Sequence, residues 1–355
     1  MQSNLINRSR FLKSIVLSNF RRSNFPLKLG FIVTYRCNMR CAMCGIWKKP
    51  LNKNELTLGE IDNFFKRANK FSWIGITGGE SFLRDDLTEI VDRIIFYSDR
   101  LCALHFATNG YLTDKIIATR DHISRKHKKI NQVYTVSIDG PESLHDEIRG
   151  VKGAWKNAID TFKLLNATKA AKAHTVFTIS RHNTGRFEDF FRTLKDVYPQ
   201  LKFDDIGVNI FQQSSFYYDN QDMEKLDERE IIKEIGKILK MDKEKISLNN
   251  FLRRTYLKLY LKYIKTKRSA LKCRALSSTC VLDPYGDIFP CSVYDKKLLN
   301  IKDLREDFSD IWNSDYIKAV SLRCSNGMCP SCWTPCDAYN AIAGSLVKAC
   351  LSNCP

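Results

Sequence analysis

The sequence contains no apolar run of the roughly 18 residues that a membrane-spanning helix requires. Its first eight residues lack both an apolar core and a small-residue cleavage site, so they are not typical of a secretory signal peptide. No internal repeat is evident either. We therefore expect a cytoplasmic protein. In that reducing compartment, the 13 cysteines are more typical of metal ligands than of disulfides.

Acidic residues are missing from two segments, residues 1–30 and 251–272, which contain several Lys and Arg but no Asp or Glu. The chain as a whole has a net charge of +18. Such basic patches can bind an anionic partner, such as a nucleic acid, a membrane surface or an acidic substrate. The alternative is the solvated surface of a lysine-rich protein, which we favour. No RNA-binding module accompanies the charge, so we do not expect a nucleic-acid partner.

The length of 355 residues and the hydrophobic fraction of 44% predict one large domain or two modest ones with a proper core. Apolar runs predict strands at 30–35, 71–77, 101–108, 132–138, 173–180 and 205–211. Amphipathic patterns predict helices near 57–69, 85–98, 113–121, 152–167 and 185–197. Thr57 and Glu60 form a capping box at the start of the first of these helices. Six strand–helix units predict an α/β fold, a parallel sheet curled into a partial (β/α)6 barrel.

The pattern of residues 1–28 predicts a basic helical segment ahead of the first strand. Its apolar residues fall near helical spacing with Arg and Lys around them: Phe11, Leu12, Ile15, Val16 and Phe20. The pattern fits a helix that lies on an anionic membrane surface. It fits equally a helix that closes the bottom of the open barrel, and we favour closure because the apolar face is short.

Three cysteines follow the first predicted strand in the pattern Cys37-x3-Cys41-x2-Cys44. A cubane [4Fe–4S] cluster normally takes four cysteines, so a three-cysteine loop leaves one iron open to another ligand. An open metal position is typical of a catalytic site, because a closed cage offers nothing to a substrate. A structural zinc site is the alternative, although no histidine lies near Cys37.

Polar or glycine-rich motifs also follow the next three predicted strands. Gly78 and Gly79 allow a close backbone approach, and Glu80 can accept a hydrogen bond from an ammonium group. Asn109 and Ser137 offer neutral hydrogen-bonding groups at strand ends. Because ligands of parallel α/β sheets bind at the carboxyl ends of the strands, all four motifs are predicted to meet at one barrel mouth. An ordinary strand-to-helix turn is the alternative for the Gly-Gly-Glu segment.

A family resemblance rests on these motifs, between about residues 29 and 211. In chain order they are Cys37-x3-Cys41-x-Met43-Cys44, Gly78-Gly79-Glu80, Thr108-Asn109-Gly110 and Ser137-Ile138-Asp139-Gly140. They resemble the signature loop and the cofactor contacts of the radical S-adenosylmethionine (SAM) enzymes. The fold that this resemblance implies is a partial (β/α)6 radical SAM barrel.

The resemblance assigns SAM contacts to Met43, Gly78, Gly79, Glu80, Asn109, Ser137 and Arg149. In the family, the Gly-Gly-Glu stretch holds the amino group of SAM, an arginine like Arg149 pairs with its carboxylate, and Met43 would lie beside the adenine. Simpler explanations remain for several of them. Arg149 can be a surface arginine, Met43 can be core packing, and Asp139 can be a turn residue.

The implied activity is reductive cleavage of SAM at the [4Fe–4S] cluster, which gives a 5′-deoxyadenosyl radical that abstracts hydrogen from a peptide or small-molecule substrate. The partners implied are that substrate and an electron donor such as flavodoxin or ferredoxin. The sequence identifies no catalytic side chain. Two other functions stay open at this point: an iron–sulfur electron carrier or redox sensor without a substrate, and a nucleic-acid-modifying radical SAM enzyme.

Nine of the cysteines lie at or beyond residue 273, in the runs Cys273-x12-Gly286-x4-Cys291, Cys324-x4-Cys329-x2-Cys332-x3-Cys336 and Cys350-x3-Cys354. The arrangement resembles the auxiliary-cluster domain, of SPASM or twitch type, that many radical SAM enzymes carry. It departs from the full SPASM spacing, which argues against a second auxiliary cluster.

One auxiliary [4Fe–4S] cluster is predicted on Cys273, Cys291, Cys332 and Cys336, with Cys329 able to replace one of them. Zinc is the alternative metal. We interpret Cys102 and Cys280 as inert core thiols. The predicted domains are the basic segment 1–28, the barrel 29–220, a helical bridge 221–272 and the auxiliary-cluster domain 273–355.

Overall fold

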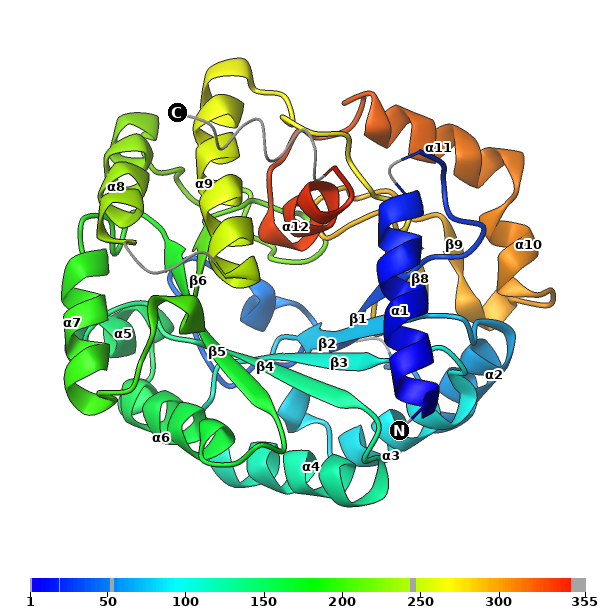
Figure 1. Cartoon of the computed structure of the whole chain (residues 1–355), viewed down its shortest axis with the longest axis horizontal. Coiled ribbons are helices and arrows are strands. Elements are labelled where there is room, and N and C mark those ends of the chain that lie inside the picture. The colour runs from blue at the N-terminus through cyan, green and yellow to red at the C-terminus, as the bar shows by residue number, and fades with distance from the viewer. Residues whose placement is uncertain (1, 19, 52–53, 243–246, 346–355) are drawn as a thin grey trace.

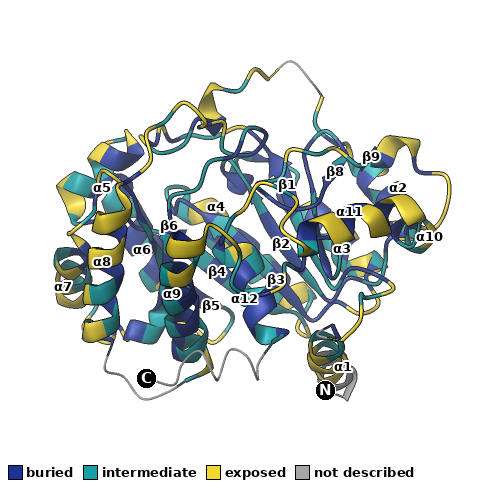
Figure 2. Cartoon of the chain, turned by 90° about the horizontal axis from the view of Figure 1, so that it is seen from above, coloured by how far each residue is buried: buried dark blue, intermediate teal, exposed yellow. Residues whose placement is uncertain are grey.

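The computed structural model of the protein describes residues 2–18, 20–51, 54–242 and 247–345. Figure 2 shows its central strands buried beneath helices whose outer faces are exposed. No helix within the described ranges is long and apolar enough to cross a membrane.

Six parallel strands form the centre of the fold, and they confirm the six predicted from the apolar runs. They are β1 (Lys28–Thr34), β2 (Trp73–Gly78), β3 (Ala103–Thr108), β4 (Asn131–Ser137), β5 (Lys172–Ile179) and β6 (Ile206–Ile210). Each strand pairs with the next one along the chain, giving the order β6-β5-β4-β3-β2-β1. All six carboxyl ends therefore lie at the same end of the barrel.

The predicted helices follow the strands and cover the outside of the barrel (Figure 1). They are α2 (Leu58–Arg67), α3 (Leu87–Tyr97), α4 (Thr113–Lys126), α6 (Ala154–Asn166) and α7 (Phe187–Val197). The capping box at the start of α2 is confirmed, with Thr57 and Glu60 bonded reciprocally. Between β4 and α6 lies a further helix, α5 (Glu142–Arg149), which the sequence did not predict and which proves important for the site.

The sheet continues beyond the barrel into the cysteine-rich region. The strand β7 (Thr279–Leu282) pairs in parallel with β1, and β8 (Asp287–Phe289) and β9 (Leu299–Asn300) add antiparallel strands. The strands β7 and β8 form a hairpin. Gly286 stands at its turn with a φ of 95°, in the left-handed region that favours glycine. Hydrogen bonds thus cross the predicted boundary at residue 273, and the domain limits stay a prediction.

The predicted bridge contains α8 (Glu228–Met241) and α9 (Leu248–Thr266), and α10 (Phe308–Trp312), α11 (Asp315–Ser325) and α12 (Pro335–Ala343) follow. Tyr256 of α9 stacks on Trp333 with ring centroids 6.5 Å apart, and it meets Tyr339 edge-on at 5.6 Å. This aromatic residue of α9 therefore serves packing. It holds α12, and with it the last described cysteines, against α9.

The N-terminal helix α1 (Gln2–Leu17) lies at the amino end of the barrel strands. The Phe11 ring stacks on Trp73, the first residue of β2, at a centroid distance of 6.1 Å. This contact fits the predicted closure of the barrel bottom, away from the cysteine loop. Leu12, Val16 and Phe20 nevertheless remain exposed, so an apolar stripe faces outward from the segment.

Candidate active site

The cysteine loop after β1 is fixed by backbone hydrogen bonds from two other parts of the chain. The amides of Arg40 and Ala42 donate to the carbonyl oxygens of Arg149 and Ile148, at 3.0 and 2.8 Å. Gly45 N donates to the Tyr218 carbonyl at 2.7 Å. The end of α5 and the segment after β6 thus hold the loop from both sides. Because α5 supplies these acceptors, the helix missed in the sequence is a main support of the site.

The thiols of the loop lie in an environment suited to an iron–sulfur cluster. Met39 N donates to Cys37 Sγ at 3.5 Å, and Arg149 Nη1 donates to Cys41 Sγ at 3.7 Å. Such bonds stabilise ligated sulfur and influence the potential of a cluster. Burial raises the pKa of Cys37 and of Cys44 to about 12, so these thiols lose their protons only when a metal binds.

The spacing of the thiols bears on the choice of metal. A tetrahedral zinc site, with Zn–S bonds of about 2.3 Å, would bring its sulfur atoms to about 3.8 Å from one another. Among the described residues, the only three His, Cys or acidic ligand atoms within 4.8 Å of one another belong to Asp92, His122 and His127. At least one pair of the loop thiols is therefore more than 4.8 Å apart, which is wider than such a zinc site requires and favours a larger cluster.

The two glycines at the end of β2 are required by the chain's own backbone. A Cβ at Gly78 would lie 2.4 Å from the Thr34 carbonyl oxygen, and one at Gly79 would lie 2.2 Å from that of Arg36. The sequence suggested that these glycines admit a ligand. The structure shows that they first admit the start of the cysteine loop, which packs directly on the end of β2.

Glu80 is fully buried and joins the ends of β2 and β3. Its carboxylate accepts the backbone N–H of Asn109 at 2.8 Å, the Thr108 hydroxyl at 3.0 Å and the Phe82 N–H at 3.3 Å. Burial raises the pKa of Glu80 to about 7 despite these bonds. The carboxylate has no exposed surface, so its contact with an ammonium group of SAM stays a prediction.

Arg149 and Asp139 form a buried ion pair behind the cysteine loop. Asp139 Oδ1 also accepts the backbone N–H of Thr178 at 2.8 Å, and its own N–H donates to His145 Nδ1 at 3.0 Å. Asp139 is therefore more than a turn residue, and Arg149 is not a surface arginine. Burial by itself would lower the pKa of Arg149, but Asp139 and Cys41 raise it above its ordinary value.

Two buried donors beside this ion pair remain free. Within the described structure, Arg149 Nε and His145 Nε2 have no hydrogen-bond partner. Arg149 also lines the cavity at the barrel mouth. An unpaired guanidinium nitrogen beside three thiols fits the carboxylate of a bound cofactor, because a buried donor without an acceptor costs about 1–3 kcal/mol.

A cavity of about 580 Å³ occupies the barrel mouth and interior. All three loop cysteines line it, together with six of the seven residues assigned to SAM by resemblance: Met43, Gly78, Gly79, Asn109, Ser137 and Arg149. Glu80 is the exception. The structure thus brings together side chains that are up to 112 positions apart in the sequence. It adds residues that the sequence analysis missed, notably Tyr217, whose hydroxyl lies 2.8 Å from Thr77 Oγ1.

Four of the auxiliary cysteines interact electrostatically with one another: Cys273, Cys291, Cys329 and Cys332. The sulfur atoms of Cys273 and Cys291 accept backbone N–H bonds from Ala275 and Tyr294, at 3.4 and 3.3 Å. Burial raises the pKa of Cys273 to about 12 and moves that of Cys332 well above its usual value. These thiols resemble those of the loop in burial and in their N–H···S bonds.

Two cysteines of the auxiliary region lie in surroundings that the sequence did not predict. Cys324, which the predicted ligand set omits, forms a side-chain hydrogen bond with Cys329 and interacts electrostatically with Cys273 and Cys291. Cys336 is exposed and lines the cavity, and its carbonyl accepts Lys28 Nζ at 3.5 Å. The predicted ligands thus stay a prediction, with Cys324 as an additional candidate.

The remaining cysteines divide into two groups. Cys102 and Cys280 are buried, as predicted for core thiols, and Cys102 Sγ donates to the Ser72 carbonyl at 3.1 Å. Cys350 and Cys354 lie outside the described residues.

Comparison with known proteins identifies the family. The Radical SAM superfamily model matches residues 31–194, and that of the SPASM iron–sulfur cluster-binding domain matches residues 273–337. The chain belongs to the radical SAM superfamily and carries a SPASM domain after its barrel. It is therefore an enzyme that uses a [4Fe–4S] cluster and SAM, with an auxiliary iron–sulfur domain.

The individual relatives share little sequence identity with this chain, but the matches extend over most of its length. The subtilosin biosynthesis protein AlbA of Bacillus subtilis is 24% identical over 340 residues, which cover 89% of this chain and 68% of AlbA. The mycofactocin maturase MftC of Mycobacterium tuberculosis is 22% identical over 355 residues, covering 94% of this chain and 82% of MftC.

Solved structures confirm the fold. SuiB of Streptococcus suis bound to its precursor peptide SuiA gives a TM-score of 0.59 at 16% identity, covering 95% of this chain and 75% of SuiB. The enzyme anSMEcpe with bound AdoMet gives a TM-score of 0.60 at 14% identity, covering 92% of this chain and 99% of that one.

Replacement of Glu80 tests whether this residue supports the binding of SAM without being needed for assembly of the cluster. The Glu80→Ala protein should retain its iron but lose SAM affinity by about 1.5–3 kcal/mol, the scale of a hydrogen bond to a charged group. Equilibrium binding of SAM, with iron analysis of the same samples, measures both. Glu80→Gln is the matched control, because its carbonyl can still accept the Asn109 N–H. If Glu80→Gln binds SAM normally, the negative charge of Glu80 is not needed for SAM binding. The residue then serves only to join the ends of β2 and β3 by hydrogen bonds.

Proposed function

We propose that the protein is a radical SAM maturase that modifies a peptide. The observation that carries this proposal is one cavity lined both by the three-cysteine loop and by Cys291 and Cys336 of the SPASM region. An electron carrier without a substrate needs no such space. The names of AlbA and MftC, and the SuiB–SuiA complex, support a peptide as the substrate class.

Cys37, Cys41 and Cys44 would hold the catalytic cluster, and SAM would take its open iron. When both are bound and the cluster is reduced, they supply a 5′-deoxyadenosyl radical that abstracts hydrogen from the substrate. The N–H groups of Met39 and Arg149 stabilise the negative charge of ligated sulfur. A flavodoxin or a ferredoxin is the electron donor that we propose.

Side chains around the loop hold it in place by hydrogen bonds, and we expect the enclosed barrel mouth to limit the entry of water. Asn109 Nδ2 donates to Asn38 Oδ1 at 2.8 Å, which joins the end of β3 to the cysteine loop. Asn220 Nδ2 donates to the Met43 carbonyl at 3.1 Å from the segment after β6. Exclusion of water matters here because a reactive intermediate must meet the substrate first.

The wall that β3, β4 and β5 contribute to the cavity offers neutral hydrogen-bonding groups. His105 Nε2 lies 2.7 Å from Thr135 Oγ1, and His174 lies on the same wall. Burial, with a smaller effect of Lys28, lowers the pKa of His105 to about 3, and burial also lowers that of His174. Both imidazoles are therefore neutral at cellular pH. Neutral donors and acceptors suit the amide groups of a peptide.

A peptide-dependent turnover experiment tests this proposal. The reconstituted enzyme should be incubated with SAM, a reductant and a peptide encoded by a short reading frame beside its gene. We expect 5′-deoxyadenosine to form in proportion to peptide, and the peptide mass to change. Turnover with a small metabolite, but with none of the encoded peptides, would show that the substrate is not a peptide. The proposed radical chemistry would be unaffected by that result.

Membrane contact by the N-terminal segment is a further proposal that the exposed Leu12, Val16 and Phe20 support. Each basic residue near an anionic surface contributes about 1 kcal/mol, so the full-length protein should co-sediment with anionic vesicles at low salt. A variant with Leu12, Val16 and Phe20 changed to Ser should lose this binding and keep the Phe11–Trp73 contact. If the full-length protein stays in the supernatant, the segment only closes the barrel.

A further inference from the structure

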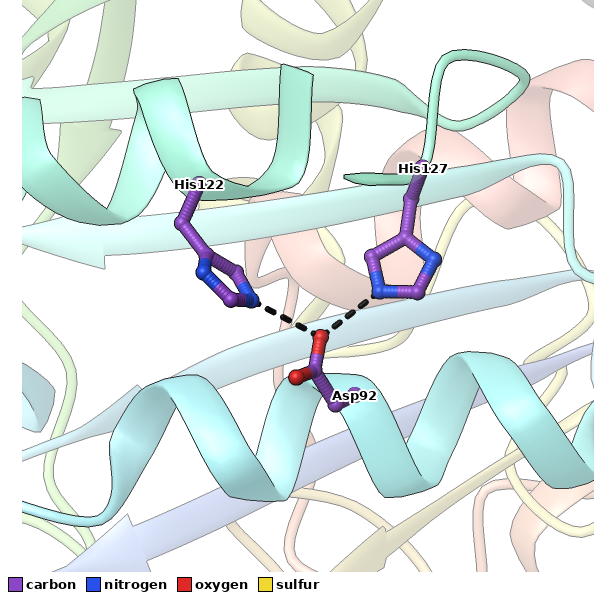
Figure 3. Close-up of side chains that lie close together, drawn as sticks. All are labelled: Asp92, His122 and His127. Carbon is purple, nitrogen blue, oxygen red and sulfur yellow. Dashed lines mark hydrogen bonds and ion pairs between the residues drawn. The ribbon is translucent and has the colours of Figure 1, made fainter. Parts of the chain in front are cut away.

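A cluster of metal-ligating side chains lies outside the barrel, away from the cysteine sites. Asp92 comes from α3, His122 from α4, and His127 ends α4 as its C-cap residue. Figure 3 shows both imidazoles turned toward the same carboxylate oxygen. The Nε2 atoms of His122 and His127 lie 2.9 and 2.6 Å from Asp92 Oδ1. None of the three residues lines the central cavity.

The donor set and its exposure suit a metal ion from solution. Two imidazole nitrogens and one carboxylate oxygen are ligands that zinc and related divalent transition metals accept, with water in a fourth position. The side chains are partly open to solvent, with 20%, 31% and 15% of their surfaces exposed for Asp92, His122 and His127. An ion can therefore enter without any rearrangement of the barrel.

Lys126 occupies the other oxygen of the carboxylate. Its Nζ lies 2.6 Å from Asp92 Oδ2, which leaves Oδ1 as the atom on which the two imidazoles converge. Partial burial opposes ionisation of Asp92, but bonds from Lys126, His122 and His127 lower its pKa to about 2. The carboxylate is thus negative at any pH at which the cell works.

We propose that Asp92, His122 and His127 form a binding site for a divalent cation of the zinc class that joins α3 to α4. The site is independent of the iron–sulfur chemistry and of the proposed function. Zinc bonds of about 2.0–2.2 Å to nitrogen and oxygen place tetrahedral ligand atoms about 3.3 Å apart. All three ligand atoms already lie within 4.8 Å of one another, and the two N···O separations need to open by only about half an ångström.

The proposal is tested by measuring the zinc content and the iron content of the same sample. The tag-free protein with its clusters in place is dialysed anaerobically against buffered micromolar Zn²⁺, and both metals are measured by mass spectrometry. The test variant is His122→Asn/His127→Asn. The matched control is His182→Asn, which removes an exposed histidine outside the cluster. Iron content and circular dichroism show whether each protein is folded and loaded.

We expect the double variant to bind one zinc fewer per chain than the unchanged protein and the control, with iron equal in all three. Zn²⁺ should also raise the unfolding temperature of the unchanged protein but not that of the double variant. Zinc displacing iron at the cysteines would lower the iron count and affect every variant equally. Equal zinc in all three proteins would overturn the proposal and leave a hydrogen-bonded clamp between the two helices.

A second variant addresses Lys126 directly. Since its ammonium repels an incoming cation, Lys126→Gln should bind Zn²⁺ several-fold more tightly at the three-residue site. This variant keeps all three ligands, so its result does not depend on the folding of the histidine variant. Unchanged or weaker zinc binding in Lys126→Gln would count against a metal on Asp92.

Discussion

The variant with Cys37, Cys41 and Cys44 all changed to Ala should lose about four irons per chain and retain the iron of the SPASM region. The three thiols lie on one loop that is held by α5 and by the segment after β6, so the triple change removes every thiol that this loop offers to a cluster. Iron analysis of the reconstituted protein measures the loss. Low-temperature electron paramagnetic resonance of the reduced protein shows which cluster remains.

A control for this variant is Cys102→Ala, which removes a buried thiol of the core and should leave the iron count unchanged. If the triple variant keeps its full iron content, the loop does not hold a cluster. The assignment of the open iron to SAM would then be lost as well.

The second large effect is expected from Gly79→Ala, which adds a single methyl group. In Gly79→Ala, the new Cβ would lie 2.2 Å from the Arg36 carbonyl oxygen and 2.8 Å from that of Tyr35. These neighbours are backbone atoms and cannot rotate away, so the segment that leads into Cys37 must move. We expect loss of iron from the loop and a fall in the free energy of unfolding of about 1–3 kcal/mol or more. Iron analysis and denaturant unfolding measure the two effects.

Gly59→Ala is the matched control, because nothing lies within 4 Å of a Cβ at Gly59, which is in α2. Alanine in a helix is favoured over glycine, so this change should leave iron and stability unchanged or slightly improved. A Gly79→Ala protein with full iron would show that the loop does not depend on its close packing against β2.

The barrel could be predicted from the sequence because each unit carries a local signal. Apolar runs such as 132–138 alternate with amphipathic helices, and the alternation by itself defines a parallel sheet. The helix α5 was missed because it has only eight residues and follows Asp139-Gly140-Pro141, which is typical of a turn. Its importance comes from tertiary contacts with the cysteine loop, which leave no mark in the sequence of either segment.

The location of the site could also be predicted, since strand ends converge at one mouth. The burial of each side chain could not. Glu80 turns into the protein because the ends of β2 and β3 supply it with N–H and hydroxyl donors. Cys336 faces the cavity because α12 packs on α9 through Tyr256, Trp333 and Tyr339. Such orientations depend on packing between distant segments and not on spacing along the chain.

Formation of 5′-deoxyadenosine from SAM is the most direct test of the whole account. The reconstituted, reduced protein should produce 5′-deoxyadenosine and methionine in equal amounts, and the Cys37/Cys41/Cys44→Ala variant should produce neither. Liquid chromatography with mass detection measures both products. Absence of 5′-deoxyadenosine from protein with a full iron content, or its formation by the triple variant, would contradict the assignment of the cysteine loop as the site of SAM cleavage.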